Sequence, residues 1–293
     1  MLVFSTETSC DETSVCIMKE DKTILSHIVN SQTVHNKHGG VVPELASRAH
    51  LEILQQITKE ALKESGVKLN DIKLFSATCG PGLIGGLLIG STFTKSLSIG
   101  NSKPFIPINH LEAHILSSFF NNEIKFPHLC LLITGGHTQI YFLKNNNDIT
   151  LIGETIDDAI GEAFDKVAKI LGLSYPGGPE IEKKAIQGDE NSFKLPKPLI
   201  NDDSSNFSFS GLKTSVNLIA KKNIIDHSFI NDMSASFQKC VGDILTIKLN
   251  RVIAELYKRN TEDLSVSVVG GVANNEYLKK CFKTIEEEEN IKF

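Results

Sequence analysis

Hydrophobic segments separated by polar stretches run along the chain in two blocks. The predicted strands and helices follow a similar order in both blocks. In the first block, short apolar runs predict strands at residues 2–6, 14–18 and 23–29. Apolar residues then recur at helical spacing over residues 44–65, which predicts a helix that ends at Gly66. The remaining elements of the block are predicted as a strand at 73–79, a glycine turn at 80–82, a helix to residue 99, a strand at 105–108 and a helix at 110–120.

The second block repeats this order. It is predicted to contain strands at 129–134, 139–143 and 150–154, helices at 156–171 and 233–258, a buried strand at 265–269 and a helix at 274–289. Two glycines again separate the last strand from the last helix. The polar stretch 191–206, with Pro196 and Pro198, is interpreted as an insertion. The chain therefore contains an internal structural repeat, although the two copies share no obvious sequence.

A duplicated α/β unit is the plan of the actin, Hsp70 and sugar kinase group, in which two RNase H-like lobes face each other across a nucleotide cleft. We predict an N-terminal lobe at 1–122 and a C-terminal lobe at 123–293, with an insertion near 175–230. The first block closes with a strand and a helix that have no counterpart in the second. Residues 291–293 resemble the start of that strand, so the repeat predicts that the last strand and helix of the second lobe are missing.

Composition is that of a globular protein, with 293 residues, 41% hydrophobic content and a formal net charge of −5. Contacts to phosphate need a basic surface, so a nucleic-acid substrate would require a local basic patch or a partner protein. The six cysteines form no C-x-x-C pair, which indicates reduced thiols. No secretory signal or membrane-spanning stretch is visible, and a cytoplasmic location is predicted.

Two histidines share one face of a predicted helix. His110 and His114 stand at positions i and i+4, a spacing that can chelate a metal ion. Two unrelated histidines on a partly buried helix are an equally good interpretation of this motif alone. A metallopeptidase helix of the H-E-x-x-H type needs its glutamate beside the first histidine. Here Glu112 is two residues on, which weakens that interpretation.

Glycine-rich segments follow two predicted strands. Thr134-Gly135-Gly136-His137-Thr138 joins hairpin strands, and its backbone N–H groups could hold an anion. Gly270-Gly271-Val272-Ala273-Asn274 ends a buried strand and opens a helix, whose N-terminus is a typical anion or nucleotide site. A plain hairpin turn is the alternative for the first segment and is favoured on that segment alone. Close packing of strand against helix is the alternative for the second.

Polar side chains gather at three further places. Residues 7–13 form a hairpin tip dense in hydroxyls and carboxylates, suited to a metal, a phosphate or proton transfer, unless it is a solvated turn. On the predicted helix 156–171, Asp158, Glu162 and Asp165 share a face that either contacts a ribose or metal or is simply exposed. Residues 175–179 predict a tight turn, and residues 208–213 predict a helix start.

In combination and in this order, the motifs resemble one family. The segments are ETSCDET, HGGVVPELASRAH, GPGLIGGL, NHLEAH, TGGHTQ, DDAIGEAFDKVAKILGLSYPGGP, FSFSGLKT and GGVANN. They resemble the tRNA N6-adenosine threonylcarbamoyltransferases, once described as O-sialoglycoprotein endopeptidases, over nearly the whole chain. The CDET tip is similar to that of the bacterial and organellar branch.

The resemblance implies an acyltransferase that moves threonylcarbamoyl from threonylcarbamoyl-AMP to N6 of adenosine 37 in tRNAs that read ANN codons. Asp11 and Glu12 at the CDET tip become the implied catalytic residues, and His110 and His114 the implied metal ligands. The implied substrate-binding residues are Ile133, Thr134, Gly135, Gly136, His137, Asp165, Gly178, Glu182 and Asn274.

The resemblance also implies one divalent metal, iron in preference to zinc. Its third protein ligand in the family is an aspartate in a T-D-N segment near the C-terminus, and no T-D-N occurs in this sequence. Implied partners are the tRNA anticodon loop, an inactive paralogue that forms a heterodimer with this subunit, a small ATPase subunit and the synthetase that makes threonylcarbamoyl-AMP.

Three other functions are compatible with parts of the sequence. An ATP-dependent kinase or ATPase of the same fold would use Mg²⁺, whereas paired histidines suit softer metals. A metallopeptidase is disfavoured by the displaced Glu112. A catalytically impaired scaffold would follow if the C-terminal segment is missing. Assays for ADP release, for peptide cleavage and for modified tRNA would distinguish these functions.

Overall fold

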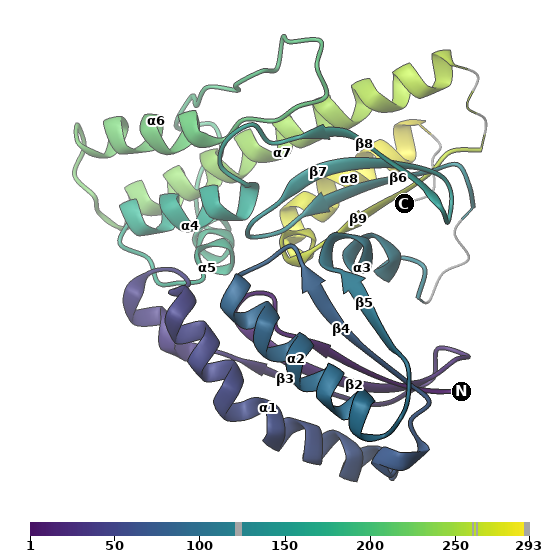
Figure 1. Cartoon of the computed structure of the whole chain (residues 1–293). Helices are drawn as coiled ribbons and strands as arrows, with labels where there is room; N and C mark the ends of the chain where they lie inside the picture. Colours follow the sequence, from purple (N-terminus) through teal and green to yellow (C-terminus); the bar gives the residue numbers. More distant parts are fainter. Residues whose placement is uncertain (121–124, 260, 262, 290–293) are drawn as a thin grey trace. The chain divides into compact units, whose positions relative to one another are not determined.

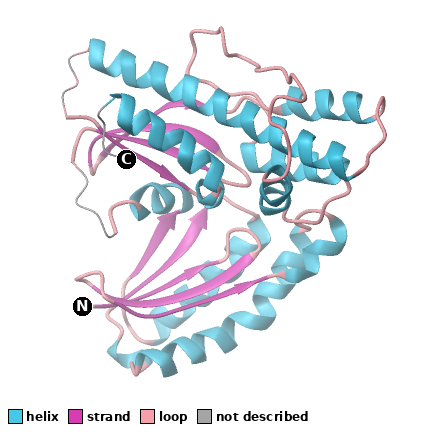
Figure 2. Ribbon diagram, turned by 180° about the vertical axis from the view of Figure 1, so that it is seen from behind, coloured by secondary structure: helices cyan, strands magenta, loops and turns pink. Residues whose placement is uncertain are grey.

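The computed structural model describes residues 1–120, 125–259, 261 and 263–289. Its contacts divide the chain into two compact units, Met1–Leu116 and Ser117–Phe293. Each unit is built on one β-sheet with helices packed against it, as the ribbon coloured by secondary structure shows (Figure 2). The predicted lobe boundary between residues 122 and 123 and the predicted strand start at 291–293 lie outside the described residues.

The first unit contains a five-stranded sheet of order β3-β2-β1-β4-β5 (Figure 1). Strands β1, β2 and β3 form an antiparallel meander, and β4 and β5 run parallel to β1. The strands are β1 (Leu2–Glu7), β2 (Glu12–Lys19), β3 (Ile24–Ser31), β4 (Leu74–Gly80) and β5 (Phe105–Asn109). The helices are α1 (Pro43–Ser65), α2 (Ile84–Gly100) and α3 (His110–Ser117), with short 3-10 turns at Thr33–His38 and Leu69–Asp71.

The bounds and the buried face of helix α1 follow directly from its sequence. Pro43 occupies its first turn, where the missing N–H of proline costs nothing, and Gly66 ends it in the left-handed conformation. Its buried face includes Leu54, Ile57 and Ala61 and packs against β2 and β3. Helix α2 lies beside α1 and packs against β4, so the two helices cover one face of the sheet (Figure 1).

The second unit contains a four-stranded sheet of order β8-β7-β6-β9. Its strands are β6 (His128–Ile133), β7 (Thr138–Asn145), β8 (Asp148–Glu154) and β9 (Ser265–Val269). Its helices are α4 (Ile160–Ile170), α5 (Gly177–Ala185), α6 (Ser210–Ala220), α7 (His227–Lys258) and α8 (Glu276–Glu289), with a 3-10 turn at Gly271–Asn274. The core joins the fully buried strand β6 to α4, α7 and α8, and the rings of Phe164 and Phe237 meet edge to face with centroids 5.0 Å apart.

Both units share one topology. An antiparallel three-stranded meander comes first, and a strand that follows at least one helix then pairs in parallel with the first strand of the meander. Helices α2 and α8 follow the parallel strands β4 and β9 in the two units. The internal repeat predicted from the order of hydrophobic segments is therefore confirmed. Among the described residues, no helix is both long and apolar enough to cross a membrane.

The predicted helix 156–171 begins too early, because α4 starts only at Ile160. Asp157 is instead a cap for α6: Oδ1 accepts from the N–H groups of Phe209 and Ser210, at 2.8 and 3.2 Å. Its Oδ2 accepts from the hydroxyls of Ser208 and Ser210, at 2.6 and 2.7 Å. These bonds hold the carboxylate outside a helix and satisfy the free N–H groups at the start of another.

Other boundaries and one helix also differ from the predictions, and α3, for example, ends at Ser117 instead of residue 120. Helix α7 begins at His227 instead of residue 233, because the side chain of Asp226 accepts from the N–H of Phe229. Helix α8 begins at Glu276 instead of residue 274, because Asn275 Oδ1 accepts from the N–H of Leu278. The segment predicted as a tight turn at 175–179 leads directly into α5, which the sequence pattern did not predict.

Candidate functional site

The two histidines lie next to each other on α3, as their spacing predicted. Asn109 starts this helix, since its Oδ1 accepts from the N–H groups of Leu111 and Glu112 at 2.9 and 3.2 Å. The rings of His110 and His114 then meet edge to face, with centroids 4.6 Å apart and planes at 80°. Glu112 is exposed.

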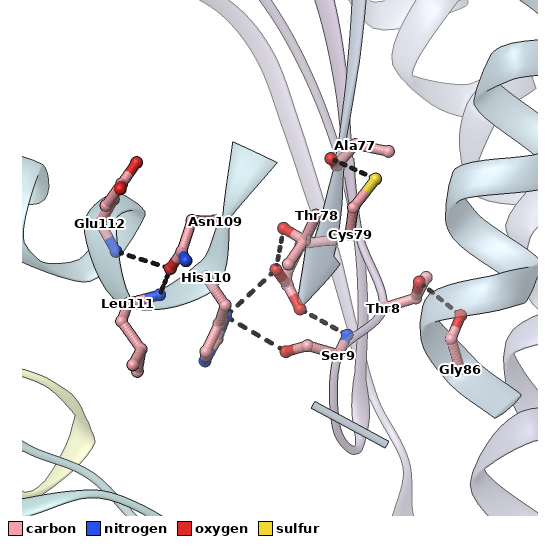
Figure 3. A network of polar contacts seen from close by, with 11 residues as sticks. Thr8, Ser9, Ala77, Thr78, Cys79, Gly86, Asn109, His110, Leu111 and Glu112 are labelled. Atoms are coloured by element: carbon pink, nitrogen blue, oxygen red, sulfur yellow. Dashed lines mark hydrogen bonds and ion pairs between the residues drawn. The ribbon is translucent and has the colours of Figure 1, made fainter. Parts of the chain in front are cut away.

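A carboxylate that the sequence analysis did not single out orients the first histidine (Figure 3). His110 Nδ1 lies 3.4 Å from Glu7 Oε2 and 3.2 Å from Ser9 Oγ. Glu7 Oε2 also accepts from the hydroxyl of Thr78, and its Oε1 accepts from the N–H of Ser9. Burial alone would raise the pKa of Glu7, but the hydrogen bonds from His110, Ser9 and Thr78 outweigh it and lower the pKa to about 2.

This arrangement fits part of a metal site. With Nδ1 of His110 turned to Glu7 and Ser9, Nε2 is the ring atom that can coordinate a metal, and a carboxylate behind a ligating histidine is the usual support. Imidazole nitrogens favour iron or zinc over Mg²⁺. Among the described residues, no group of three or more His, Cys, Asp and Glu side chains is placed to hold a metal, and the ligand role of His110 and His114 stays a prediction.

The two predicted catalytic carboxylates differ in their surroundings. Asp11 is half-buried in the turn between β1 and β2, where its backbone C=O accepts from the N–H of Gln32 at 3.0 Å. Glu12 is exposed at the start of β2, and its Oε1 accepts from the hydroxyl of Ser31 at 2.9 Å. Both catalytic roles stay predictions. The carboxylate of Glu12 is already hydrogen-bonded to Ser31 of β3.

The glycine-rich start of α2 packs closely against the turn that carries Asp11. The N–H of Leu83 donates to Ser9 O at 2.7 Å, and a Cβ at Gly82 would lie 2.6 Å from the same oxygen. A Cβ at Gly86 would lie 2.4 Å from Thr8 O. Close packing therefore explains this glycine segment.

In the second unit, the Gly135-Gly136 turn is closed by the threonine before it. Thr134 Oγ1 accepts from the N–H groups of Gly136 and His137 at 3.3 and 2.9 Å, and the N–H of Thr134 donates to His137 O at 2.8 Å. Two of the amides expected to face an anion are thus bonded within the turn. Gly135 and Gly136 are exposed, and a Cβ on either would meet open space, so a ligand can approach their backbone closely.

Two further glycines, Gly161 and Gly270, bring other elements to this turn. A Cβ at Gly161 would lie 2.6 Å from Gly135 Cα, which places the first turn of α4 directly on the hairpin. A Cβ at Gly270 would lie 2.4 Å from Ile133 O, and Gly270 has a φ of 103°. Ile133 itself is fully buried at the end of β6. The ends of β6 and β9 and the start of α4 therefore meet at Thr134.

The other predicted substrate residues lie around α5 and α8. Asp165 Oδ1 accepts from the N–H of Gly177 at 2.7 Å, which ties the first turn of α5 to α4. Gly178 follows with open space around its Cα. Glu182 Oε1 accepts from the N–H of Glu276 at 2.6 Å, two residues beyond Asn274, which is exposed.

A cavity of about 700 Å³ lies beside these residues, within the second unit. Its lining residues are Pro179, Glu182, Lys183, Ala185, Ile186, Gly188, Glu190, Ala235, Gln238, Glu276, Tyr277 and Lys280. Tyr277 OH donates to Glu190 Oε2 at 3.2 Å across it. Partly apolar walls with a few polar groups are typical of a small-molecule site.

The predicted acidic face of α4 does not act as one unit. Lys166 Nζ bonds Asp158 Oδ1 at 2.6 Å and Glu162 Oε1 at 2.8 Å, whereas Asp165 turns to Gly177. Sequence reasoning included Glu7 in the candidate hairpin tip 7–13 but gave it no role of its own, and it missed Gly161. Glu7 is the first residue of the ETSCDET segment, which was the available signal, and Gly161 carried no signal of its own.

Solved structures of low sequence identity share this fold. The activator of the 2-hydroxyisocaproyl-CoA dehydratase from Clostridium difficile, a structure with bound ADPNP, matches 100% of this chain and 87% of its own with a TM-score of 0.52 and 16% identity. Component A of the (R)-2-hydroxyglutaryl-CoA dehydratase from Acidaminococcus fermentans matches 100% of this chain and 90% of its own, with a TM-score of 0.52 and 15% identity. Together with the repeated topology, this confirms the predicted duplicated α/β class of the actin, Hsp70 and sugar kinase type.

Sequence relatives define the family. The sequence model described as tRNA N6-adenosine threonylcarbamoyltransferase matches residues 23–293. The protein of that name from Rickettsia rickettsii (strain Sheila Smith) is 49% identical over 290 residues, which cover 96% of this chain and 84% of the relative. That from Ehrlichia ruminantium (strain Gardel) is 46% identical over 291 residues, covering 99% and 84%. The chain belongs to the tRNA N6-adenosine threonylcarbamoyltransferase family, and it is a tRNA-modifying transferase.

Proposed function

We propose that this chain transfers the threonylcarbamoyl group of threonylcarbamoyl-AMP to N6 of adenosine 37 in tRNAs that read ANN codons. The observation that carries the proposal is the histidine pair of α3 with Glu7 behind it, in a chain whose relatives are named for this transfer. The finer choice of donor and acceptor nucleotide goes beyond those names. It follows from the motif resemblance, from the two histidines of the first unit and, separately, from the cavity of about 700 Å³ in the second unit.

The reaction needs no covalent enzyme intermediate. The donor is a mixed anhydride, so N6 of adenine can attack the carbamoyl carbon directly. The bond from N6 to that carbon forms, the bond from the carbon to the phosphate oxygen breaks, and AMP leaves. The N6 proton needs an acceptor, which we assign to Asp11, a half-buried carboxylate at the hairpin tip.

His110 and His114 would hold the metal, with Glu7 fixing the ring of His110. A bound divalent ion supplies Lewis acidity and a fixed positive charge for the donor's oxygens. The protein's own contribution is to keep Glu7 ionised and His110 oriented before the donor arrives. Imidazole ligands suit both iron and zinc. We propose iron ahead of zinc because the family resemblance implies iron.

The nucleoside of the donor would bind the second unit. We assign its ribose to Asp165, Glu182 and the open backbone of Gly178. We assign its base to the neighbouring cavity of about 700 Å³, near Asn274. The exposed turn Gly135-Gly136, where a Cβ would meet open space, would lie along the donor's phosphate or carbonyl oxygen. Ile133, Thr134 and His137 shape that turn.

Partners complete the proposal. With a formal charge of −5, the chain is expected to share tRNA binding with other subunits, which are a small ATPase and the donor synthetase in addition to the paralogue. For the paralogue we assign the apolar residues Leu51 of α1 and Ile84 and Leu88 of α2, which are 69%, 77% and 59% exposed. Because tRNA is the acceptor, we place the reaction in the cytoplasm.

The test uses two tRNAs that differ at one nucleotide. The chain and its helper proteins are incubated with donor labelled in the threonine moiety and either an ANN-reading tRNA or the same tRNA with guanosine at position 37. Label in the first tRNA alone supports the proposal. Equal label in both tRNAs, or ADP release in place of label, would contradict it.

A further inference from the structure

A buried polar network lies behind the hairpin tip that carries Asp11. It consists of Thr13, Gln32, His35 and His50, which are 0%, 9%, 0% and 0% exposed. His50 ends the segment HGGVVPELASRAH, to which the proposed reaction gives no role. Buried polar side chains are expensive unless every one is paired, so a network of this size needs a reason.

The hydrogen bonds of His35 fix its tautomer. The N–H of Val42 donates to His35 Nδ1 at 3.2 Å, so Nδ1 carries no proton. His35 Nε2 lies 2.8 Å from Gln32 Oε1, which can only accept. His35 is therefore neutral with its proton on Nε2. It orients the amide of Gln32 so that the NH₂ group points away from His35.

The same argument fixes His50. Its Nε2 lies 3.0 Å from Cys10 O, and a carbonyl can only accept, so Nε2 carries the proton. Its Nδ1 then accepts from Gln32 Nε2 at 3.2 Å and from the hydroxyl of Thr13 at 2.8 Å. The second N–H of Gln32 donates to Ala46 O at 3.2 Å. Every hydrogen bond in the network therefore has a defined donor and a defined acceptor.

The network ends on the backbone around Asp11. His50 holds Cys10 O, and the backbone N–H of Gln32 donates to Asp11 O at 3.0 Å. On the other side of the tip, the N–H of Leu83 donates to Ser9 O at 2.7 Å. The tip is therefore fixed from α1 and from α2, and the neutral form of His50 lets Nδ1 accept from Thr13 and Gln32 while Nε2 donates to Cys10 O. Desolvation by burial lowers the pKa of His50, which favours that form.

We propose that His50, with Gln32 and His35 as its support, is a positioning residue for the proposed carboxylate Asp11. The inference rests on the proposed function, since it assumes that Asp11 accepts the N6 proton. His50 does not touch substrate. It acts by holding the peptide between Cys10 and Asp11, where a shift of about 1 Å can cost up to about a hundredfold in rate.

Three variants separate positioning from general stability. His50→Leu removes all three bonds of the His50 ring, Thr13→Val removes one donor at nearly constant shape, and His50→Gln can still donate to Cys10 O. His27→Leu is the matched control, because His27 is exposed and bonds Ser14 of the neighbouring strand β2, away from this network. We expect kcat to fall about tenfold to a hundredfold in H50L and severalfold in T13V, with KM for the donor unchanged.

In H50Q we expect most of kcat to return, and in H27L no change. Wild-type kcat in folded H50L and T13V would overturn the proposal. So would a rise in KM for the donor with kcat unchanged. If H50L does not fold, T13V and H50Q decide the matter by the same criteria.

A measurement without substrate keeps this inference distinct from the proposed function. Imidazole nitrogen NMR of the intact chain at neutral pH should show His35 and His50 as neutral Nε2–H tautomers. Amide hydrogen exchange at residues 9–12 should be faster in T13V than in H27L. The wild-type chain could show both the expected tautomers and the expected exchange rates and still transfer no threonylcarbamoyl group. In that case the proposed reaction is wrong, but the hydrogen-bond network is correct. An Nδ1–H or charged His50 would overturn the network itself.

Discussion

Glu7 lies directly behind His110, with 3.4 Å between Glu7 Oε2 and His110 Nδ1. The two residues come from β1 and α3, more than a hundred positions apart, and the parallel pairing of β1 with β4 and of β4 with β5 brings them together. Ser9 and Thr78 complete the surroundings of the carboxylate. The sheet of the first unit thus gives α3 a fixed first histidine.

Removing the charge of Glu7 should weaken metal binding. We expect Glu7→Gln to lower the affinity of the chain for Zn²⁺ or Co²⁺ about tenfold to a hundredfold, because the carboxylate orients His110 and raises its basicity. The control is Glu112→Gln, because Glu112 lies on the same helix as His110 but is exposed. This variant should bind the metal as the wild type does. Metal titration followed by cobalt absorption measures both. Equal affinities would contradict the supporting role of Glu7.

Replacing Asp11 should slow the chemical step and leave the donor bound. For Asp11→Asn we expect kcat to fall about a hundredfold or more, the usual contribution of a positioned general base, with the donor Kd unchanged. Asp21→Asn, in the exposed turn between β2 and β3, should behave as the wild type. Single-turnover kinetics and equilibrium binding give the two quantities. A parallel loss of donor affinity would assign Asp11 to binding instead.

The close approach at Gly161 should appear in the stability of the second unit. A Cβ at Gly161 would lie 2.6 Å from Gly135 Cα and 2.8 Å from Thr134 O, both backbone atoms that cannot move freely. We expect Gly161→Ala to lower the free energy of unfolding by about 1–3 kcal/mol. Gly100→Ala, where a Cβ meets open space, should be neutral or slightly stabilising. Urea unfolding compares the two variants, and equal midpoints would contradict the packing argument.

Acid should destabilise the second unit through His128. This buried side chain bonds Ser265 and Ser267 at 2.7 Å each, and desolvation by burial lowers its pKa to about 4. Because the folded pKa is below the unfolded value of about 6.5, stability is complete above pH 6.5 and is lost as the pH falls toward 4. From pH 6.5 to pH 5 the loss should be about 2 kcal/mol.

His128→Gln should flatten this dependence, whatever its effect on stability at neutral pH. His27→Gln, an exposed histidine of the other unit, should retain the wild-type slope. Urea unfolding at several pH values gives each slope. Identical slopes in His128→Gln and the wild type would show that His128 does not titrate on unfolding.

The sequence predicted the elements whose period depends on one buried face. Helix α1 is such a case, since its apolar residues determine which side is covered. Strand β6 was predicted from its continuous apolar run, because both of its faces are buried. The sequence pattern failed where tertiary contacts decide the local structure. Asp157 leaves the helical pattern because four bonds to residues 208–210 hold it elsewhere, more than fifty positions along the chain. Helix α5 was missed because its first turn holds two glycines and a proline.

The candidate site was predicted from motif order, not from geometry. The spacing of His110 and His114 determines their contact on any helix, so that part followed from the sequence. The support from Glu7 did not, because it depends on which strands pair. Whether Gly135 and Gly136 offer free amides could not be predicted either, since Thr134 Oγ1 takes up two N–H groups of the turn.

The central claim is tested most directly by the modified nucleoside itself. The chain, its helper proteins, threonylcarbamoyl-AMP and an unmodified ANN-reading tRNA are incubated, and the digested tRNA is examined by mass spectrometry. We expect N6-threonylcarbamoyladenosine at position 37 with the wild-type chain, and at least a hundredfold less per unit time with Asp11→Asn. Unmodified adenosine throughout, with the donor intact and the chain folded, would contradict the central claim.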